Sequence, residues 1–327
     1  MSDASSLRPI VFAALERRRA LVDDPALDAF RVVNGESDGA PGLVIERLGP
    51  ALIVQLHEGR LSASPERLRP AIEALHQTLG TRAVYIKQFV RDRNQSDAQR
   101  EQAHHDATPW IGMPTPPELA IHEGELKYLV RPYDGFSVGL FLDQRDNRAR
   151  VRDASSGRRV LNLFAYTCGF SVAAAAGGAI QASSVDLAKK SLEWGKANFA
   201  ANGLDPAGFL FYASDVLEFY ARAARQGRRY DLIVLDPPTF SRTRRPARVF
   251  VLEEQLPSLL AGSIALLDPG GVLLVSTNCR ALDHRRLETA VAEAAAGRRH
   301  RVTARPGLPI DFAGDPHYAK SMWIEFS

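Results

Sequence analysis

Three aspartates close apolar runs of the kind that form buried strands, and each is suited to holding a ligand. They are Asp186, Asp215 and Asp236. An acidic side chain about twenty residues after a strand-to-helix turn is where a ribose diol is held. One strand further along, Asp215 could accept a hydrogen bond from an adenine amino group. Asp186 and Asp215 also suit the N-cap of a helix, so both interpretations stay open at this point.

The turn that precedes Asp186 is NLFAYTCGFS (162–171). Gly169 lets backbone approach a ligand closely, and the N-terminus of a small-residue helix follows. The segment lacks the GxGxxG pattern, which disfavours a pyrophosphate-binding loop and hence a nicotinamide dehydrogenase. An ordinary strand-to-helix turn is the alternative. Taken with Asp186 and Asp215, the turn predicts a pocket for an adenosine that carries no phosphates.

The segment DPPTF (236–240) follows the next predicted strand. Two prolines fix the backbone and remove amide donors, which leaves carbonyl groups and the Asp236 carboxylate facing the crevice. Such acceptors suit a planar base beside the cofactor, with Phe240 as a stacking surface. The structural alternative is a strand that simply ends at proline and is followed by a core phenylalanine.

Strand-like and helix-like runs alternate after Asp134, which positions these residues at neighbouring strand ends. The expected strands are 159–166, 179–186, 209–214, 230–238 and 272–278, and the expected helices are 169–179, 187–203, 216–227 and 252–271. Such alternation with short connections predicts an α/β fold with a mostly parallel, Rossmann-like sheet and helices on both faces. A ligand of such a sheet lies at the carboxyl ends of its strands.

The first third of the chain has a different pattern. It contains two expected hairpins, 43–57 and 119–132, with a helix at 65–80 and a strand at 83–90 between them. The polar, proline-rich stretch 91–118 is the best linker. We therefore expect a small N-terminal α/β domain over 1–118, which contributes to substrate recognition, and the Rossmann-like domain over 119–327.

Composition limits the class of protein. The 327 residues include two cysteines, which exclude a disulfide framework and a four-thiolate zinc site. No metal site or membrane segment is expected, and the N-terminus does not have the pattern of a signal peptide, so a cytoplasmic protein is predicted. Of 41 basic residues 35 are arginine, while the net charge is only +3. Arginine binds phosphate well, although a GC-rich genome also explains this excess.

Specific motifs extend these expectations to a family. The turn, the aspartates and DPPTF resemble class I S-adenosylmethionine-dependent methyltransferases. More narrowly, FSVGLFLDQRDNR (136–148), RVVNGESDGAPGLVIERLG (31–49) and DPHYAKSMWIEF (315–326) resemble the large-subunit (23S) ribosomal RNA methyltransferase family, which includes 5-methylcytosine and 7-methylguanine enzymes. Members often begin with an RNA-binding PUA module. This chain starts too close to the middle domain to hold one, which leaves the RNA target open.

The resemblance implies S-adenosylmethionine as cofactor and assigns roles to individual residues. Asp186 holds the ribose, and Asp215 holds the adenine. The loop bordering the cofactor comprises Phe141, Asp143, Gln144 and Arg145, although Arg145 and Arg148 also suit a surface salt-bridge face. The wall around the methionine end comprises Asn162, Phe164, Tyr166 and Gly169. The residues that face the target base are Asp236, Pro237, Pro238 and Phe240.

The modified atom depends on Asn278 and Cys279. Methylation of cytosine C5 requires a thiolate that adds at C6. Counted from Gly270, the cysteine position of this family falls on Asn278, and Cys279 comes one residue later, which in a strand points to the other face. A bulge would restore it. The Ser-x-Asn pattern more closely resembles the guanine-N7 type, which needs no covalent catalyst and depends on positioning. We expect Cys168 to be a packed thiol.

The segment SRTRRPARVF (241–250) follows the expected base pocket. Its arginines are Arg242, Arg244, Arg245 and Arg248. There they would meet RNA phosphates, or they form a solvated charge run. RNA, and specifically ribosomal RNA, is the expected partner. Rival functions are methylation of an exocyclic amino group, methylation of a small molecule or protein, and RNA binding without turnover.

Overall fold

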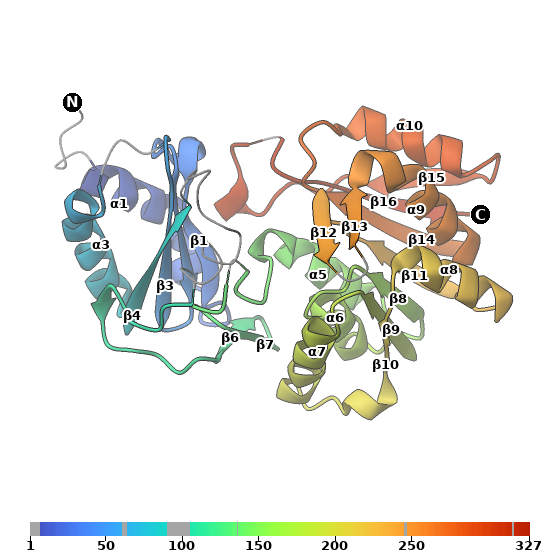
Figure 1. Cartoon of the computed structure of the whole chain (residues 1–327), viewed down its shortest axis with the longest axis horizontal. Coiled ribbons are helices and arrows are strands. Elements are labelled where there is room, and N and C mark those ends of the chain that lie inside the picture. Colours follow the sequence, from blue (N-terminus) through green and yellow to red (C-terminus); the bar gives the residue numbers. More distant parts are fainter. Residues whose placement is uncertain (1–6, 61–63, 90–104, 136, 245–246, 316) are drawn as a thin grey trace. The chain divides into compact units, whose positions relative to one another are not determined.

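A computed structural model describes the chain except for residues 1–6, 61–63, 90–104, 136, 245–246 and 316, and it does not describe the side chains of 242–248. The chain forms two compact units (Figure 1). The first comprises 1–143 and 309–314, and the second comprises 144–308 and 315–327. In the described part of the chain, no helix has the length and apolar character needed to cross a bilayer.

The first unit is built on a five-stranded sheet with the order β1-β2-β3-β4-β5. The strands are β1 (Ala29–Asn34), β2 (Leu43–Leu48), β3 (Ala51–His57), β4 (Ala83–Phe89) and β5 (Ile111–Gly112). The expected hairpin of β2 and β3 is confirmed, and α3 (Pro65–Leu79) carries the chain from β3 to the parallel strand β4. Apolar side chains of α3 and of α1 (Leu7–Arg17) share a core with the sheet. The remaining helical pieces of this unit are α2 (Arg19–Val22), η2 (Gly35–Asp38), η3 (Leu142–Gln144, which ends at the first residue of the second unit) and η5 (Ile310–Phe312).

The second expected hairpin is also present, as β6 (Leu119–Glu123) and β7 (Leu126–Val130). It is part of the first unit, because Leu27 bridges Glu123 and the carboxylate of Asp28 accepts hydrogen bonds from the backbone N–H and the ring of His122. The two units therefore divide after Asp143, whereas the sequence places the domain boundary at residue 118. The described part of the proline-rich stretch, 105–118, belongs to the first unit.

The second unit contains a seven-stranded sheet with the order β10-β9-β8-β11-β14-β16-β15. The parallel strands are β8 (Arg159–Leu163), β9 (Gln181–Asp186), β10 (Leu210–Ala213), β11 (Tyr230–Leu235) and β14 (Leu267–Thr277). The strand β16 (Lys320–Phe326) runs antiparallel between β14 and β15 (His300–Ala304). This is the α/β, Rossmann-like arrangement expected from the alternating runs.

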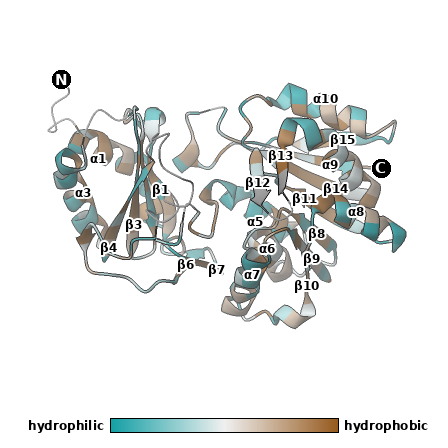
Figure 2. Ribbon diagram, in the orientation of Figure 1, coloured by the Kyte–Doolittle hydropathy of each residue, from teal (hydrophilic) through white to brown (hydrophobic). Residues whose placement is uncertain are grey.

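Helices cover both faces of this sheet, and both polar and apolar residues occur along α8 and α10 (Figure 2). One apolar core is shared by α8 (Val216–Arg225), α9 (Leu252–Leu266) and α10 (His284–Ala294), and the other by α5 (Arg145–Asp153) and α6 (Gly169–Ala176). The helix α7 (Lys189–Ala201) contacts β9 and β10, and η4 (Pro206–Gly208) precedes β10. A separate hairpin is formed by β12 (Phe240–Arg244) and β13 (Ala247–Val251).

Candidate active site

The sheet order reverses between β8 and β11, because the chain first builds outward through β9 and β10 and then returns to the other side of β8. Ligands of open α/β sheets bind in the crevice outside the carboxyl ends of the strands at such a switch point. The loops after β8 and β11 therefore form the centre of the candidate site, and the ends of β9, β10 and β14 lie along the same edge.

The turn after β8 has an unusual backbone. Phe164, Tyr166 and Cys168 adopt positive φ angles of 56°, 47° and 63°. Left-handed backbone is rarely adopted by residues other than glycine, and it persists only where surrounding contacts hold it. One such contact is the hydrogen bond from the Tyr166 backbone N–H to Asp186 Oδ2, at 2.8 Å. The turn is therefore held in a single shape by the aspartate at the end of the neighbouring strand.

Asp186 closes β9 and accepts two backbone hydrogen bonds. Its Oδ2 accepts from Tyr166, and its Oδ1 accepts from Ala188 N at 2.8 Å. Burial raises the pKa of this carboxyl group above its ordinary value, while the two N–H donors act in the opposite direction. Each carboxylate oxygen has a second acceptor position, so two hydroxyl groups of a ligand can still be bound.

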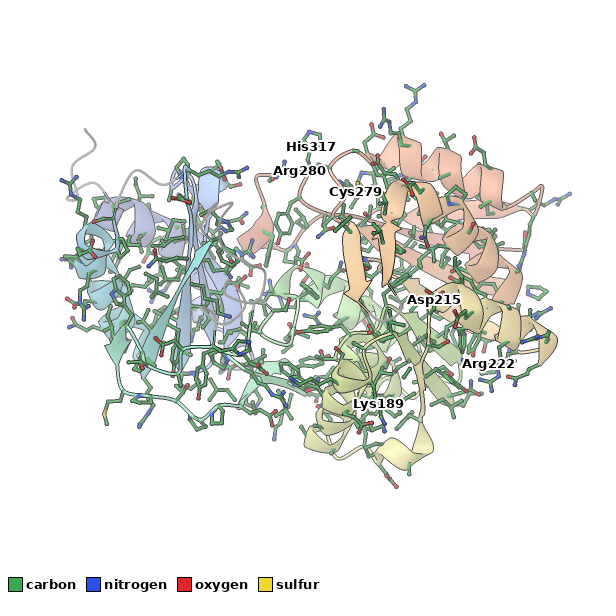
Figure 3. All side chains as sticks on the ribbon, in the orientation of Figure 1. Lys189, Asp215, Arg222, Cys279, Arg280 and His317 are labelled. Atoms are coloured by element: carbon green, nitrogen blue, oxygen red, sulfur yellow. The ribbon has the colours of Figure 1, made fainter. Side chains whose placement is uncertain are left out.

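Asp215 follows β10 and is the N-cap of α8 (Figure 3). Its Oδ1 accepts hydrogen bonds from Leu217 N at 2.9 Å and from Glu218 N at 3.3 Å. The helix-capping role that the sequence suggests for Asp215 is thus confirmed. The end of β10 is also fixed relative to β9, because Ser214 N donates to the carbonyl of Asp186 at 3.0 Å. The two aspartates consequently occupy neighbouring positions on the edge of the sheet.

The residues predicted to line the methionine end lie in and around this turn. Asn162 is only 2% exposed and donates to Ser171 Oγ at 2.9 Å, which ties β8 to α6. Phe164 is half-buried, and its ring packs edge-on against Phe250, with 5.6 Å between centroids. The half-buried Tyr166 lies 6.3 Å from the ring of Trp194, and Gly169 begins α6.

Cys168 is fully buried, and burial raises the pKa of its thiol to about 12. A thiol with such a pKa is not a nucleophile at neutral pH. The thiol packs directly over the glycine of α7: a Cβ at Gly195 would lie 2.3 Å from Cys168 Sγ. The cysteine is therefore a structural part of the turn, and Gly195 provides the space that the thiol occupies.

The predicted cofactor loop is divided between the two units. Gln144 and Arg145 open the second unit, while Phe141, which is 52% exposed, and Asp143 close the first. Gln144 is buried and donates to Ser276 Oγ in β14 at 2.7 Å. Arg145 lies 3.8 Å from the carboxylate of Asp146. The side chain of Gln144 thus fixes the start of α5 against β14.

The loop after β11 presents Asp236, Pro237, Pro238, Thr239 and Phe240 in succession. Asp236 is half-buried and Pro237 is buried, whereas Pro238 and Thr239 are exposed and Phe240 is 51% exposed. Phe240 begins the β12–β13 hairpin, in which residue 242 pairs with residue 249. Of the predicted RNA-binding arginines, Arg242, Arg244 and Arg248 lie on the strands of this hairpin, with side chains outside the described part of the structure, and Arg245 lies outside the described residues.

At the end of β14, the two candidate catalytic residues, Asn278 and Cys279, differ in burial. Asn278 is exposed, and its Oδ1 accepts a hydrogen bond from the Thr239 hydroxyl at 2.6 Å. Cys279 is 4% exposed and belongs to the apolar core that includes Leu282 and Leu287. The structure thus gives the two neighbouring side chains opposite environments, one in the loop region beside Thr239 and one in the interior.

Two contacts of the site were missed by sequence reasoning. Thr239, inside the DPPTF segment, is the hydrogen-bond partner of Asn278, a contact that the sequence does not indicate. Lys320 donates to the carbonyl of Cys279 at 2.7 Å. Pairing of β16 with β14 brings Lys320 beside Thr277, and no local motif signals this pairing. Among the described residues, no group of three histidine, cysteine or acidic side chains is positioned to hold a metal ion.

Comparisons with known proteins agree with this geometry. Residues 43–315 match the model of a family described as S-adenosylmethionine-dependent methyltransferase. The chain is 37% identical over 258 residues to ribosomal RNA large subunit methyltransferase I of Klebsiella pneumoniae, over 79% of this chain and 62% of that protein. It is 35% identical over 324 residues to a ribosomal RNA large subunit methyltransferase of Deinococcus radiodurans, over 96% of this chain and 77% of that protein.

The similarity extends to solved structures. A protein described as a methyltransferase, solved in complex with SAH, superposes with a TM-score of 0.86 at 27% identity. The superposition covers 99% of this chain and 82% of the other. The chain spans less than two thirds of the length of the Klebsiella relative.

Proposed function

The chain belongs to the S-adenosylmethionine-dependent methyltransferase family, and on this premise we propose that it methylates a base of ribosomal RNA, with guanine N7 as the modified atom. S-adenosylmethionine is its cofactor. The RNA substrate is supported by the names of the Klebsiella and Deinococcus relatives. The choice of atom rests on one observation: Asn278 is exposed at the end of β14 while Cys279 is buried in the core.

The two carboxylates and the turn at the ends of β8, β9 and β10 fit an adenosine that carries a methionine in place of phosphates. Asp186 accepts the two ribose hydroxyls with the acceptor positions left by Tyr166 and Ala188. Asp215, one strand further, accepts from the adenine amino group. The left-handed turn between Phe164 and Cys168 curves around the methionine portion. When bound, the cofactor supplies an electrophilic methyl group attached to a sulfonium.

The target base lies beside the loop after β11. Phe240, half-exposed, provides a face for stacking. Asp236 accepts hydrogen bonds from the amino and imino groups of guanine. Because Thr239 occupies Oδ1 of Asn278, the amide nitrogen of Asn278 is left to donate to guanine O6. This set of contacts orients N7, whose in-plane lone pair attacks the methyl carbon while the carbon–sulfur bond breaks.

No nucleophile or base from the protein is required for this reaction, because guanine N7 is itself the nucleophile. N7 carries no proton, so methylation leaves a cationic ring and no proton has to be removed. The protein therefore accelerates the reaction by holding guanine N7 and the methyl group of the cofactor at contact distance. The exposed Asn278 and the buried Cys279 are consistent with that requirement.

Methylation of cytosine C5 is the second candidate function. It requires a thiolate at C6, and Cys279 is adjacent to Asn278. The observation in its favour is that the ammonium of Lys320 contacts the same residue, with its Nζ 2.7 Å from the carbonyl oxygen of Cys279. Against it, the thiol lies among leucine side chains of the core.

Mass spectrometry of ribosomal RNA nucleosides tests the proposal. RNA from a strain that lacks the gene is expected to lose one 7-methylguanosine, and expression of the wild-type chain is expected to restore it. Loss of a 5-methylcytidine would favour the second candidate. An unchanged nucleoside profile would exclude ribosomal RNA as the substrate.

A further inference from the structure

The buried ammonium group of Lys320 lies beside the end of β14. Figure 3 labels Cys279 and His317, whose carbonyl groups accept its hydrogen bonds. Lys320 is 3% exposed and pairs with Thr277 across the β14–β16 ladder. Its Nζ donates to the carbonyl of Cys279 at 2.7 Å and to the carbonyl of His317 at 3.3 Å. The lysine therefore joins the turn after β14 to the segment that leads into β16.

This ammonium is held by carbonyl groups alone. Within the described residues, Lys320 makes no ion pair with a carboxylate. A buried charge is costly unless it is hydrogen-bonded or paired, so the two carbonyl groups are what hold this ammonium in place. Burial lowers the pKa of Lys320, and Arg280 acts in the same direction, while the nearby Cys279, Asp315 and Asp283 act against both.

The carbonyl that Lys320 holds determines the shape of the turn. Cys279 O also accepts from Leu282 N at 3.2 Å, and Cys279 N donates to Thr277 Oγ1 at 3.0 Å. Both peptide groups that flank Cys279 are therefore fixed. With its backbone fixed in this way, Cys279 directs its side chain into the core, and the preceding residue, Asn278, directs its own toward Thr239.

We propose that Lys320 is a positioning residue that locks the turn 277–280, so that Asn278 faces the target base and the Cys279 thiol stays in the core. The role in orienting Asn278 rests on the proposed function. The role in burying the thiol does not, and it can be measured without any methyl transfer.

The first measurement is the reactivity of Cys279 toward a thiol reagent, 5,5′-dithiobis(2-nitrobenzoate), in the native full-length chain. Lys320→Met keeps the length of the side chain and removes every donor. We expect Cys279 to react about tenfold faster in this variant, because a charge-assisted hydrogen bond to the turn is lost. Lys320→Arg retains donors and is expected to restore part of the protection. The same variants in a Cys279→Ser background identify which thiol reacts.

The second measurement separates positioning from cofactor binding. Lys320→Met is expected to lower kcat for RNA methylation by about tenfold. The affinity for S-adenosylmethionine, measured by calorimetry, is expected to stay unchanged, because the aspartates that bind it lie on β9 and at the end of β10. Lys196→Met is the matched control, since Lys196 lies on α7 and makes a surface ion pair with Glu193.

The outcomes are distinguishable. Unchanged thiol reactivity in folded Lys320→Met overturns the proposal, and so does an equal loss of cofactor affinity. If the wild-type chain transfers no methyl group, the proposed function fails, while the thiol measurement still decides the role of Lys320. If Lys320→Met does not fold, Lys320→Gln provides the test, because its side chain is shorter by one bond and uncharged and cannot keep the charge-assisted hydrogen bond; an intermediate rise in thiol reactivity is then expected, and an unchanged reactivity overturns the proposal.

Discussion

The hydroxyl of Thr239 donates a hydrogen bond to Oδ1 of Asn278, with 2.6 Å between the two oxygens. This bond joins the loop after β11 to the end of β14, two strands that are neighbours in the sheet. It gives the Asn278 amide a defined orientation, with its carbonyl engaged and its nitrogen turned away from Thr239. On the proposed function, this orientation leaves the amide nitrogen available to an acceptor on the substrate, such as guanine O6.

Substitution of Asp186 tests the proposed cofactor pocket. Asp186→Asn is expected to weaken S-adenosylmethionine binding by at least about tenfold, because the acceptor of a ribose hydroxyl and the bond that holds Tyr166 both change. Titration calorimetry measures this affinity. Asp153→Asn, an exposed substitution in α5, is the control and should leave the affinity unchanged.

The pH dependence of the same affinity follows from the direction of the pKa shift. Burial raises the pKa of Asp186, so the carboxylate takes up a proton at a higher pH than an ordinary aspartate does. A protonated carboxyl group loses one acceptor position. Cofactor affinity should therefore weaken as pH falls through this raised pKa, and the change should be absent in Asp186→Asn. A constant affinity across the acidic range would contradict the assignment.

Asp215 tests whether one residue serves both as a helix cap and as an adenine ligand. Asp215→Ala removes the cap of α8 and is expected to lower the free energy of unfolding by about 1 kcal/mol. Asp215→Ser keeps a capping oxygen and should lose less stability. Both variants should bind S-adenosylmethionine more weakly. Normal binding by the serine variant, measured by calorimetry, would leave Asp215 with the capping role alone.

Substitution of Gly195 tests how tightly α7 packs against Cys168 in the turn after β8. In Gly195→Ala the new Cβ would lie 2.3 Å from Cys168 Sγ, so we expect a loss of about 1–3 kcal/mol in the free energy of unfolding, measured in urea. Cys168→Gly removes the obstructing atoms at a position whose φ of 63° suits glycine, and the double variant should recover stability. Gly208→Ala, where no neighbouring atom lies within 4 Å of the added Cβ, is the control.

The arginines of the β12–β13 hairpin test the RNA partner. RNA binding should weaken as salt rises, and Arg242→Ala with Arg244→Ala should reduce the slope of log affinity against log salt by about 0.7–0.9 per lost phosphate contact. Fluorescence anisotropy with a ribosomal RNA fragment measures the slope. Arg225→Ala with Arg229→Ala, both exposed near the start of β11, should leave it unchanged. An affinity independent of salt would contradict an RNA substrate.

Much of the second unit follows from the sequence alone. The alternation of apolar runs and amphipathic stretches indicates the parallel strands, and the side chains after each strand end indicate the crevice. The order of the strands and the insertion of β16 between β14 and β15 do not follow, because antiparallel pairing over long separations leaves no local periodicity. The contact between Lys320 and Cys279 could therefore not be predicted, because it depends on the pairing of β16 with β14.

Two other features depended on tertiary contacts. The arginine-rich segment 241–250 has no apolar alternation, so its sequence suggests a loop, yet it forms most of a hairpin whose Phe250 packs against Phe164. The hairpin β6–β7 follows the proline-rich stretch, so its sequence suggests the start of a new domain. Its contacts with Asp28 instead make it part of the first unit.

The central claim is that the chain methylates guanine N7 through Asn278 and without a cysteine nucleophile. The most direct test is transfer of the methyl group from S-adenosylmethionine to unmodified ribosomal RNA, with mass spectrometry of the nucleosides, for the wild type, Asn278→Ala and Cys279→Ser. We predict 7-methylguanosine from the wild type, a rate close to it for Cys279→Ser, and a rate at least about tenfold lower for Asn278→Ala. Formation of 5-methylcytidine by the wild type, abolished in Cys279→Ser, would contradict the claim.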